Sequence, residues 1–293
     1  MKRILITGAR GFVGSHWFES SRLREQSRAV SLQTTQVSDV DLQDIDTVIH
    51  MAGIAHRMGQ PSGSIYYEIN RDMTLQLARR ARDAGVRHFI YLSSTKVMGD
   101  EGGYFDEHSV PHPVDDYGKS KLEAELGLAK LQDVSPHSEP WAVSIVRPPL
   151  IYGPRVKGNV LRILDLLSKP WPLPFDGIHN ARSMVSVGNL IALIERIIEL
   201  RAPGTFVAGD AAPISTTELV RGLAEGMPLP PRLFALPRWT QGTTLRVFPG
   251  IGQRLFGSYV VSNTATNQAL GFTCPIESRE ALRETGQWYA GGR

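Results

Sequence analysis

The stretch TGARGFVG, residues 7–14, decides the fold. It follows the apolar run KRILIT (residues 2–7) and precedes a helical pattern of apolar residues. Its glycines, Gly8, Gly11 and Gly14, stand three residues apart, and glycine permits a tight turn and close approach of the backbone to a pyrophosphate. The start of the helix then offers free N–H groups to phosphates. A strand, this turn and a helix in this order predict a dinucleotide-binding site; the alternative is a tight turn without a ligand.

Apolar runs and helical patterns alternate through the first half of the chain. Strands are predicted at residues 2–7, 28–32, 46–53, 87–94 and 142–148, and helices at residues 12–23, 65–84 and from about residue 115. The strand runs are continuously apolar, which is typical of a parallel sheet covered on both faces. We therefore predict an α/β fold, with a Rossmann-like doubly wound parallel sheet and a smaller C-terminal substrate lobe.

The amino-acid composition changes after Pro148, where Pro, Gly and Arg become frequent. The patterns there predict an amphipathic helix at 187–200, a strand at 204–210 and a capped helix that begins near Ser215. We expect residues 1–150 to form the dinucleotide-binding domain and residues 151–293 to form mainly the substrate-binding lobe. Part of 183–210 is expected to return to the first domain.

Composition excludes several classes of protein. The chain has 293 residues, 42% of them hydrophobic and 21% charged, which is typical of a globular protein with a large core. A single cysteine, Cys274, excludes an internal disulfide, and no spacing of ligand residues suggests a metal. No run is long enough to enter a membrane and no signal peptide is evident, so we expect a cytoplasmic protein. The formal charge of +3 comes from scattered cations, which indicates a small anionic ligand rather than nucleic acid.

The stretch DDYGKSKLEAE, residues 115–125, places Tyr117 four residues before Lys121. This spacing puts both side chains on one face of a helix, one turn apart. A neighbouring cation stabilises a phenolate and lowers the pKa of tyrosine below its usual value of about 10. The alternative is a solvated pair on a helix surface. The glycine turn and Ser94 upstream favour a catalytic acid held beside a cation.

These motifs in this order resemble the extended short-chain dehydrogenase/reductase family, in its nucleotide-sugar branch. The resemblance covers nearly the whole chain and includes TGARGFVG, HMAG (50–53), SSTKVMG (93–99), YGKSK (117–121), VRPPLIYGP (146–154) and RSMVSVGNL (182–190). It implies that Tyr117 is the general acid/base, that Lys121 holds the nicotinamide ribose, and that Ser94 orients the reacting sugar oxygen.

The resemblance also implies the binding residues. Asp39 is similar to the acid that contacts adenine, and Asn159 and Arg182 are similar to ligands of the sugar nucleotide's diphosphate. The full set of implied cofactor contacts is Gly8, Arg10, Gly11, Phe12, Val13, Gly14, Asp39, Val40, Ala52, Gly53, Ser93, Tyr117, Lys121 and Pro148. The implied substrate contacts are Ser94, Thr95, Asn159 and Arg182. Asn70 fits a structural asparagine of the family, His50 is expected to be a packed strand residue, and a role for His56 and Arg57 at the substrate is left open.

The choice of cofactor depends on the end of the second predicted strand. A site for NAD usually carries an acid there, which binds the ribose 2′-hydroxyl. The stretch VSLQTTQ (residues 30–36) has none. Arg10, inside the glycine turn, can bind a 2′-phosphate through its guanidinium. Both features favour NADP(H), with NAD(H) as the alternative, and Arg10 can equally be a solvated loop residue.

Two reactions fit the Ser–Tyr–Lys set. The first is NADPH-dependent reduction of the 4-keto group of a UDP-linked 6-deoxy-N-acetylhexosamine. The stretches RPPLIYGPRVKGN (147–159) and IHNARSMVSVGNL (178–190) resemble bacterial reductases of that kind. Those reductases serve the synthesis of surface polysaccharide such as the O-antigen of lipopolysaccharide. The alternative is a UDP-hexose 4-epimerase with tightly held NAD. A dehydratase is less favoured because Thr95 and Lys96 stand where its acids would be. A non-catalytic, cofactor-sensing regulator is least favoured because Tyr117 and Lys121 are both present. The family further implies a homodimer that pairs through residues 65–84 and 115–132.

Overall fold

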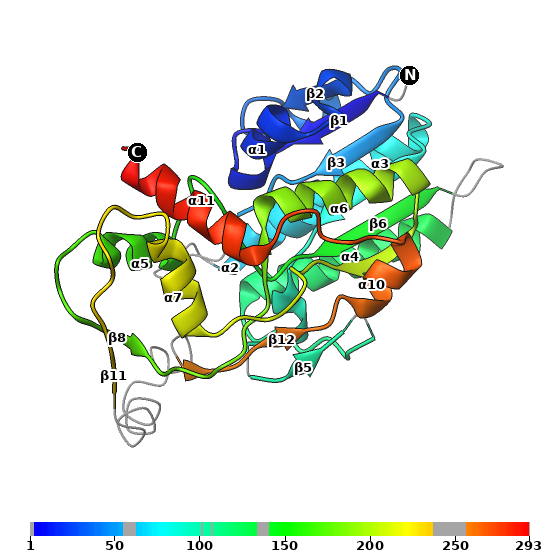
Figure 1. The fold of residues 1–293 in the computed structure, drawn as a ribbon. Helices are drawn as coiled ribbons and strands as arrows, with labels where there is room; N and C mark the ends of the chain where they lie inside the picture. The colour runs from blue at the N-terminus through cyan, green and yellow to red at the C-terminus, as the bar shows by residue number, and fades with distance from the viewer. Residues whose placement is uncertain are drawn as a thin grey trace.

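The computed structural model of the chain describes residues 3–54, 63–100, 102–106, 108–133, 141–236 and 256–292. Six strands form one parallel sheet in the order β10-β6-β4-β3-β1-β2 (Figure 1). Their bounds are β1 Ile4–Thr7, β2 Ser27–Val30, β3 Thr47–His50, β4 His88–Leu92, β6 Ala142–Arg147 and β10 Gly204–Val207. The predicted α/β fold with a parallel sheet is confirmed.

Helices cover both faces of this sheet, as a doubly wound fold requires. Alternate residues of a strand point to opposite faces, so Ile4 and Ile6 pack with α1 (Phe12–Ser20) and α6 (Val187–Leu200). Leu5 lies on the opposite face, in the core formed with α3 (Met73–Asp83) and α4 (Asp116–Asp133). Figure 1 shows the two pairs of helices on opposite sides of the sheet.

The helix predicted at residues 65–84 is observed as three consecutive segments. α2 (Gly63–Tyr66) leads into a π-helical turn, η3 (Tyr67–Asp72), which continues into α3. π-Helical turns are frequent at functional sites. This one carries Asn70, whose side-chain amide pairs with the backbone of Ile54, through Ile54 N at 2.9 Å and Ile54 O at 3.2 Å. Asn70 therefore fixes the chain just beyond Gly53, in the structural role that the sequence predicted.

A smaller C-terminal region has its own hydrophobic core, near α11 at one end of the sheet (Figure 1). Its elements are α5 Asn159–Leu167, β8 Leu173–Asp176, α7 Thr216–Ala224, β11 Leu233–Ala235 and α11 Ser278–Ala290. The predicted cap of α7 is present, because Ser215 and Glu218 form a reciprocal capping box. β10 lies in the main sheet, beside β6. The division of the chain near residue 150 stays a prediction.

The remaining strands form short parallel pairs. β7 (Leu150–Tyr152) pairs with β9 (Met184–Ser186), and β5 (Tyr104–Phe105) pairs with β12 (Val260–Val261). α10 (Thr264–Leu270) packs near α6. In the described part of the chain, no helix is sufficiently long and apolar to cross a membrane.

A buried carboxylate, Asp210, ties these elements together. It accepts hydrogen bonds from the Tyr152 hydroxyl at 2.6 Å, Asn189 Nδ2 at 2.7 Å and the Ser186 backbone N–H at 3.0 Å. The Ser278 hydroxyl lies 3.4 Å away and donates a fourth, longer bond. Residues from β7, α6, β9 and α11 thus meet at one side chain.

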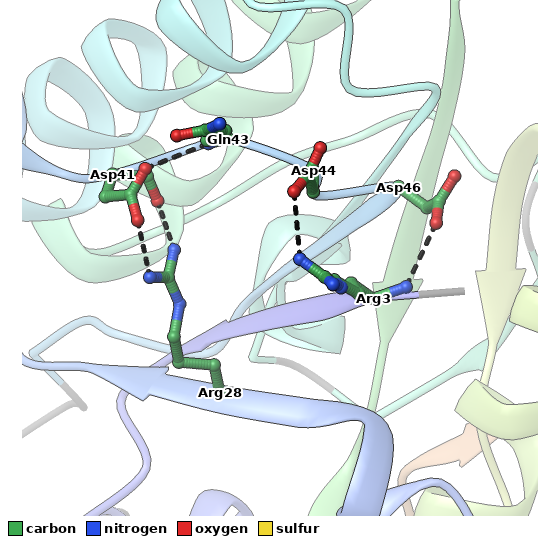
Figure 2. A network of polar contacts seen from close by, with 6 residues as sticks. All are labelled: Arg3, Arg28, Asp41, Gln43, Asp44 and Asp46. Atoms are coloured by element: carbon green, nitrogen blue, oxygen red, sulfur yellow. Dashed lines mark hydrogen bonds and ion pairs between the residues drawn. The ribbon is translucent and has the colours of Figure 1, made fainter. Parts of the chain in front are cut away.

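A network of carboxylates and arginines lies at the edge of the sheet where β1 and β3 begin, as Figure 2 shows. The Arg3 guanidinium lies 3.0 Å from Asp44, and its backbone N–H donates to Asp46 at 3.0 Å. Arg28 pairs with Asp41 at 2.7 Å. Asp41 is 60% and Asp44 61% exposed, in contrast to the buried Asp210, whereas Asp46 is half-buried.

Candidate active site

The ends of the parallel strands bring the predicted residues to one edge of the sheet. β1, β3, β4 and β6 end at Thr7, His50, Leu92 and Arg147. In open parallel sheets, ligands bind outside these carboxyl ends. The residues that follow the four strands are Gly8, then Ala52 and Gly53, then Ser93, Ser94 and Thr95, and Pro148. The fold therefore gathers most of the predicted cofactor residues, although their roles stay predictions.

The glycine turn is packed too closely for a side chain at Gly8 or Gly14. Gly8 has a φ of +77°, and a Cβ there would lie 2.6 Å from Ala52 N. A Cβ on Gly14 would lie 2.3 Å from Gly8 O. Gly11 caps α1 through its backbone, and within the described residues no side chain caps this helix. The first-turn N–H groups are therefore suited to a phosphate, and the turn fits a dinucleotide.

The adenine end of the proposed cofactor site is less enclosed. Arg10 and Asp39 are both exposed, whereas Val40 is buried. The loop that carries Asp39 is fixed by Arg80, which donates to Val37 O and, at 3.2 Å, to Val40 O. Phe12 is half-buried and Val13 is buried in the core. β2 ends at Val30 without an acid, so the feature that favoured NADP(H) is also present in the fold.

Tyr117 lies in the first turn of α4, and its phenol is hydrogen-bonded to the Ser94 side chain. Ser94 Oγ also accepts the backbone N–H of Lys96 at 3.2 Å. That bond occupies a lone pair of Ser94, so its own proton is directed to the phenol or to a substrate oxygen. The edge of the Tyr66 ring packs against the Tyr117 ring, with centroids 6.1 Å apart.

Lys121 lies one turn beyond Tyr117 and is buried. Its ammonium donates to Leu92 O at 2.9 Å and lies 4.6 Å from the centre of the Tyr91 ring. A Cβ on Gly53 would lie 3.4 Å from Lys121 Nζ. The sheet edge, the Gly53 turn and α4 therefore converge on this amine.

The pKa values of the pair differ from the expectation based on sequence. Burial raises the pKa of Tyr117 to about 12, and the hydrogen bond from Ser94 opposes that shift. The ammonium of Lys121 donates to Leu92 O, and burial outweighs any lowering, so the pKa of Tyr117 is raised where the sequence predicted a lowered value. Burial lowers the pKa of Lys121 to about 8, against the attraction of Glu125. At neutral pH the pair is thus a neutral phenol and an ammonium.

Two predicted substrate residues lie near this group, and one does not. The carbonyl of Thr95 accepts a hydrogen bond from the Tyr259 hydroxyl at 2.8 Å. Arg182 forms a backbone bridge with Tyr259, and its guanidinium donates to Gly257 O at 3.1 Å. Asn159 begins α5 and is exposed, and no hydrogen bond to another described residue ties it to the group. Tyr259 was missed because no local pattern marks it; His56 and Arg57 lie outside the described residues.

His50 is a packed core residue, as the sequence indicated. Its two ring nitrogens contact Thr7 Oγ1 at 2.7 Å and Thr74 Oγ1 at 2.9 Å. Burial lowers its pKa to about 3, with a smaller effect from the charge of Lys121. The ring is therefore neutral at physiological pH and supports the end of β3.

Comparison with known proteins identifies the family. The sequence pattern of the NAD dependent epimerase/dehydratase family matches residues 4–209. A UDP-glucose 4-epimerase of Vibrio cholerae is 34% identical to the chain over 98% of its length and 95% of the epimerase. The chain belongs to the NAD dependent epimerase/dehydratase family, and it is an NAD(P)-dependent enzyme of the extended short-chain dehydrogenase/reductase type.

Solved structures share the whole fold. MoeE5, in complex with UDP-glucuronic acid and NAD, superposes with a TM-score of 0.76 at 23% identity, over 99% of this chain and 100% of that one. RMD from Pseudomonas aeruginosa, complexed with NADPH, has a TM-score of 0.76 at 20% identity, over 99% of each chain. The fold thus accommodates either nicotinamide cofactor in its relatives, and these likenesses extend to the fold alone.

Proposed function

We propose that the protein is a 4-epimerase of a UDP-linked hexose or N-acetylhexosamine. The assembled group of Ser94, Tyr117 and Lys121 is the observation that carries the proposal. The match of the chain to a UDP-glucose 4-epimerase over 98% of its length supports it. This was the alternative at the sequence level, and the comparisons favour it over the 4-keto reductase.

The chain's own residues supply the proton chemistry. In its ionised form, Tyr117 takes the proton of the sugar 4-hydroxyl and later returns it to the same oxygen, while Ser94 donates a hydrogen bond to that oxygen. A bound nicotinamide supplies the acceptor, and then the donor, of the hydride at carbon 4. The neutral phenol of Tyr117 is ready to donate at pH 7, and the cation of Lys121 makes its ionised form less costly. Arg182 and Thr95 are proposed to hold the sugar nucleotide.

The test begins with the purified protein. We expect incubation with UDP-glucose or UDP-N-acetylglucosamine to yield the corresponding 4-epimer, detected by anion-exchange chromatography, without added reductant. Denaturation should release bound NAD in a ratio near one per chain. Tyr117→Phe should keep the fold and lower kcat by about 10²–10⁴-fold, the usual contribution of a general acid–base group. Full turnover by this variant would defeat the mechanism.

A second candidate is the 4-keto reductase, because Arg10 is exposed in the glycine turn and no acid follows β2. Arg10 is then proposed to bind the 2′-phosphate of NADPH, and the substrate would be a UDP-4-keto-6-deoxy-N-acetylhexosamine of surface polysaccharide synthesis. Oxidation of free NADPH with that sugar, and no epimer from UDP-hexoses, would establish the reductase. Arg10→Ala should then raise the KM for NADPH and leave the KM for NADH unchanged.

A homodimer is proposed from the groove between η3, α3 and α4. The groove is lined by Leu75, Leu126 and Leu131 among the cations Arg79 and Lys130, and Leu126 is 56% exposed. Apolar side chains left in water on two packed helices are typical of an interface. We expect a dimer by light scattering and a monomer for Leu126→Arg; a monomeric wild-type protein would contradict the proposal.

A further inference from the structure

A buried ion pair lies beneath the catalytic group, and neither its anion nor its cation was anticipated from sequence. Glu125 follows Lys121 by one turn of α4, on the face that carries Tyr117. Its side chain is 3% exposed and that of Arg147, at the end of β6, is 8% exposed. Arg147 binds it with a fork, Nε to Oε1 at 3.1 Å and Nη2 to Oε2 at 2.6 Å. Such a bidentate pair fixes orientation as well as distance.

The same carboxylate holds the end of β4. The Ser93 hydroxyl donates to Glu125 Oε1, and the Ser93 backbone N–H donates to Val146 O at 2.8 Å. The residue before Ser93 is Leu92, whose carbonyl accepts the ammonium of Lys121. The residue after it is Ser94, which is hydrogen-bonded to Tyr117. Ser93 therefore fixes the chain between Leu92, whose carbonyl binds Lys121, and Ser94, whose side chain binds Tyr117.

Glu125 also places a negative charge near two buried cations. Lys121 and Arg147 are both buried cations, and buried charges are tolerated only when they are paired. The groups that face Lys121 are Tyr117 and Glu125 on α4, Tyr91 on β4 and the neutral His50 on β3. The Glu125 carboxylate is the one anion in this set, so it binds Arg147 and also offsets part of the charge of Lys121.

We propose that Glu125 is a positioning residue of the catalytic centre, which fixes the end of β4 through Ser93 and balances the buried charge of Lys121. It acts through these residues and does not touch the substrate. The kinetic part of this proposal rests on the proposed 4-epimerase, because turnover requires protonated Lys121. The effect on Lys121 itself is independent of the substrate.

The test compares Glu125→Gln with Glu123→Gln, which removes the same charge from the exposed face of the same helix. We expect Glu125→Gln to move the alkaline limb of kcat to lower pH, since Lys121, whose pKa is about 8 in the native protein, loses its partner. At the native midpoint kcat should fall about fivefold for a shift of one pH unit and about fiftyfold for two, with little change in KM. Glu123→Gln should leave both unchanged.

Two further measurements separate the proposal from the proposed function and from misfolding. The titration of Lys121, followed by NMR of ¹³C-labelled lysine and assigned with Lys121→Arg, should move to lower pH in Glu125→Gln even if no sugar is turned over. Ser93→Ala, which keeps all charges, should lower kcat without moving the titration. An unmoved Lys121 titration in folded Glu125→Gln, or wild-type kcat in Ser93→Ala, would overturn the proposal. If Glu125→Gln does not fold, Glu125→Asp replaces it. It draws the carboxylate back by one methylene, so the Lys121 titration and the alkaline limb of kcat should both move to lower pH by a smaller amount.

Discussion

Glu125 and Asp210 are both buried carboxylates, yet the chain satisfies them in opposite ways. Glu125 is paired with a buried cation, Arg147, and a single hydroxyl. Asp210 is bound by neutral donors from Tyr152, Asn189 and the Ser186 backbone, and by no cation among the described residues. The first lies one helical turn from Lys121, and the second joins the sheet to the C-terminal region.

The difference shows what each carboxylate can do. An ion pair is nearly neutral as a unit, so the Glu125–Arg147 pair acts only on close neighbours such as Lys121, one helical turn away. Neutral donors stabilise the carboxylate of Asp210 without cancelling its charge, and that charge adds to burial in raising the pKa of the Cys274 thiol. A buried pair is also fragile, because removing one partner leaves an uncompensated charge. Four experiments on stability test this distinction, in order of decreasing effect.

Arg147→Met should be the most damaging change, because it leaves Glu125 buried without a cation. We expect the free energy of unfolding, measured with urea, to fall by about 3–5 kcal/mol. The double variant with Glu125→Leu should recover most of that loss, since apolar groups can replace a buried pair at little cost. A loss below about 1 kcal/mol in the single variant would mean that the pair behaves as if it were exposed.

His50 extends the comparison to a buried base that is kept neutral. Its pKa is about 3 in the folded protein and 6.5 without burial, so the unfolded chain binds more protons between these values. Stability from this residue is therefore complete above pH 6.5 and is lost as the pH falls. Between pH 7 and pH 5 the loss should be about 2 kcal/mol. In urea unfolding, the free energy of unfolding of His50→Gln should change less with pH than that of the native protein. Some change should remain, because burial also lowers the pKa of His16.

Asp210→Asn should be milder than the Arg147 change, although the carboxylate is equally buried. An amide oxygen can still accept from Asn189 and Ser186, and its NH₂ group can donate to the Tyr152 and Ser278 hydroxyls. We expect a loss of about 1–2 kcal/mol, the difference between charged and neutral hydrogen bonds. The proposed epimerase activity per folded molecule should be retained. A loss equal to that of Arg147→Met would show that Asp210 depends on its charge.

Asp44→Asn should have the smallest effect. Asp44 is 61% exposed beside Arg3, and exposed ion pairs contribute about 0–1 kcal/mol. Asparagine also tolerates the left-handed backbone at this position, where φ is 58°. We expect the urea midpoint to stay within experimental error of the native protein. A clear shift would give the network in Figure 2 a structural role.

Local patterns predicted the elements well where one short stretch contains the whole cause. The helix expected at residues 187–200 is observed as Val187–Leu200, and the cap at Ser215 is observed with its partner Glu218. Strand positions were also predicted, although the apolar runs are longer than the strands because they continue into the turns. The π-helical turn at Asn70 was not predicted, because its partner is the distant backbone of Ile54.

The candidate site was predicted as far as its motifs extend. Ser94, Tyr117 and Lys121 come together because their strand and helix do. The pairing of Glu125 with Arg147 joins α4 to β6 across 22 residues, and no local pattern reports such a contact. The one available hint was the position of Glu125, a helical turn after Lys121. The raised pKa of Tyr117 could not be predicted, because it depends on the burial of the ring, and the local sequence does not show how deeply a side chain is buried.

The strand order has a consequence for how the protein is made. β6 lies between β4 and β10, and β10 begins at residue 204, far behind β6 in the chain. During synthesis, β6 is therefore an open edge of the sheet until more than two hundred residues have left the ribosome. Open edges are templates for pairing with other chains, and parallel pairing across such distances is slow. The nascent chain thus carries α4 on a sheet whose β6 edge is still unpaired, and a chaperone that covers β6 would protect the chain until β10 is made.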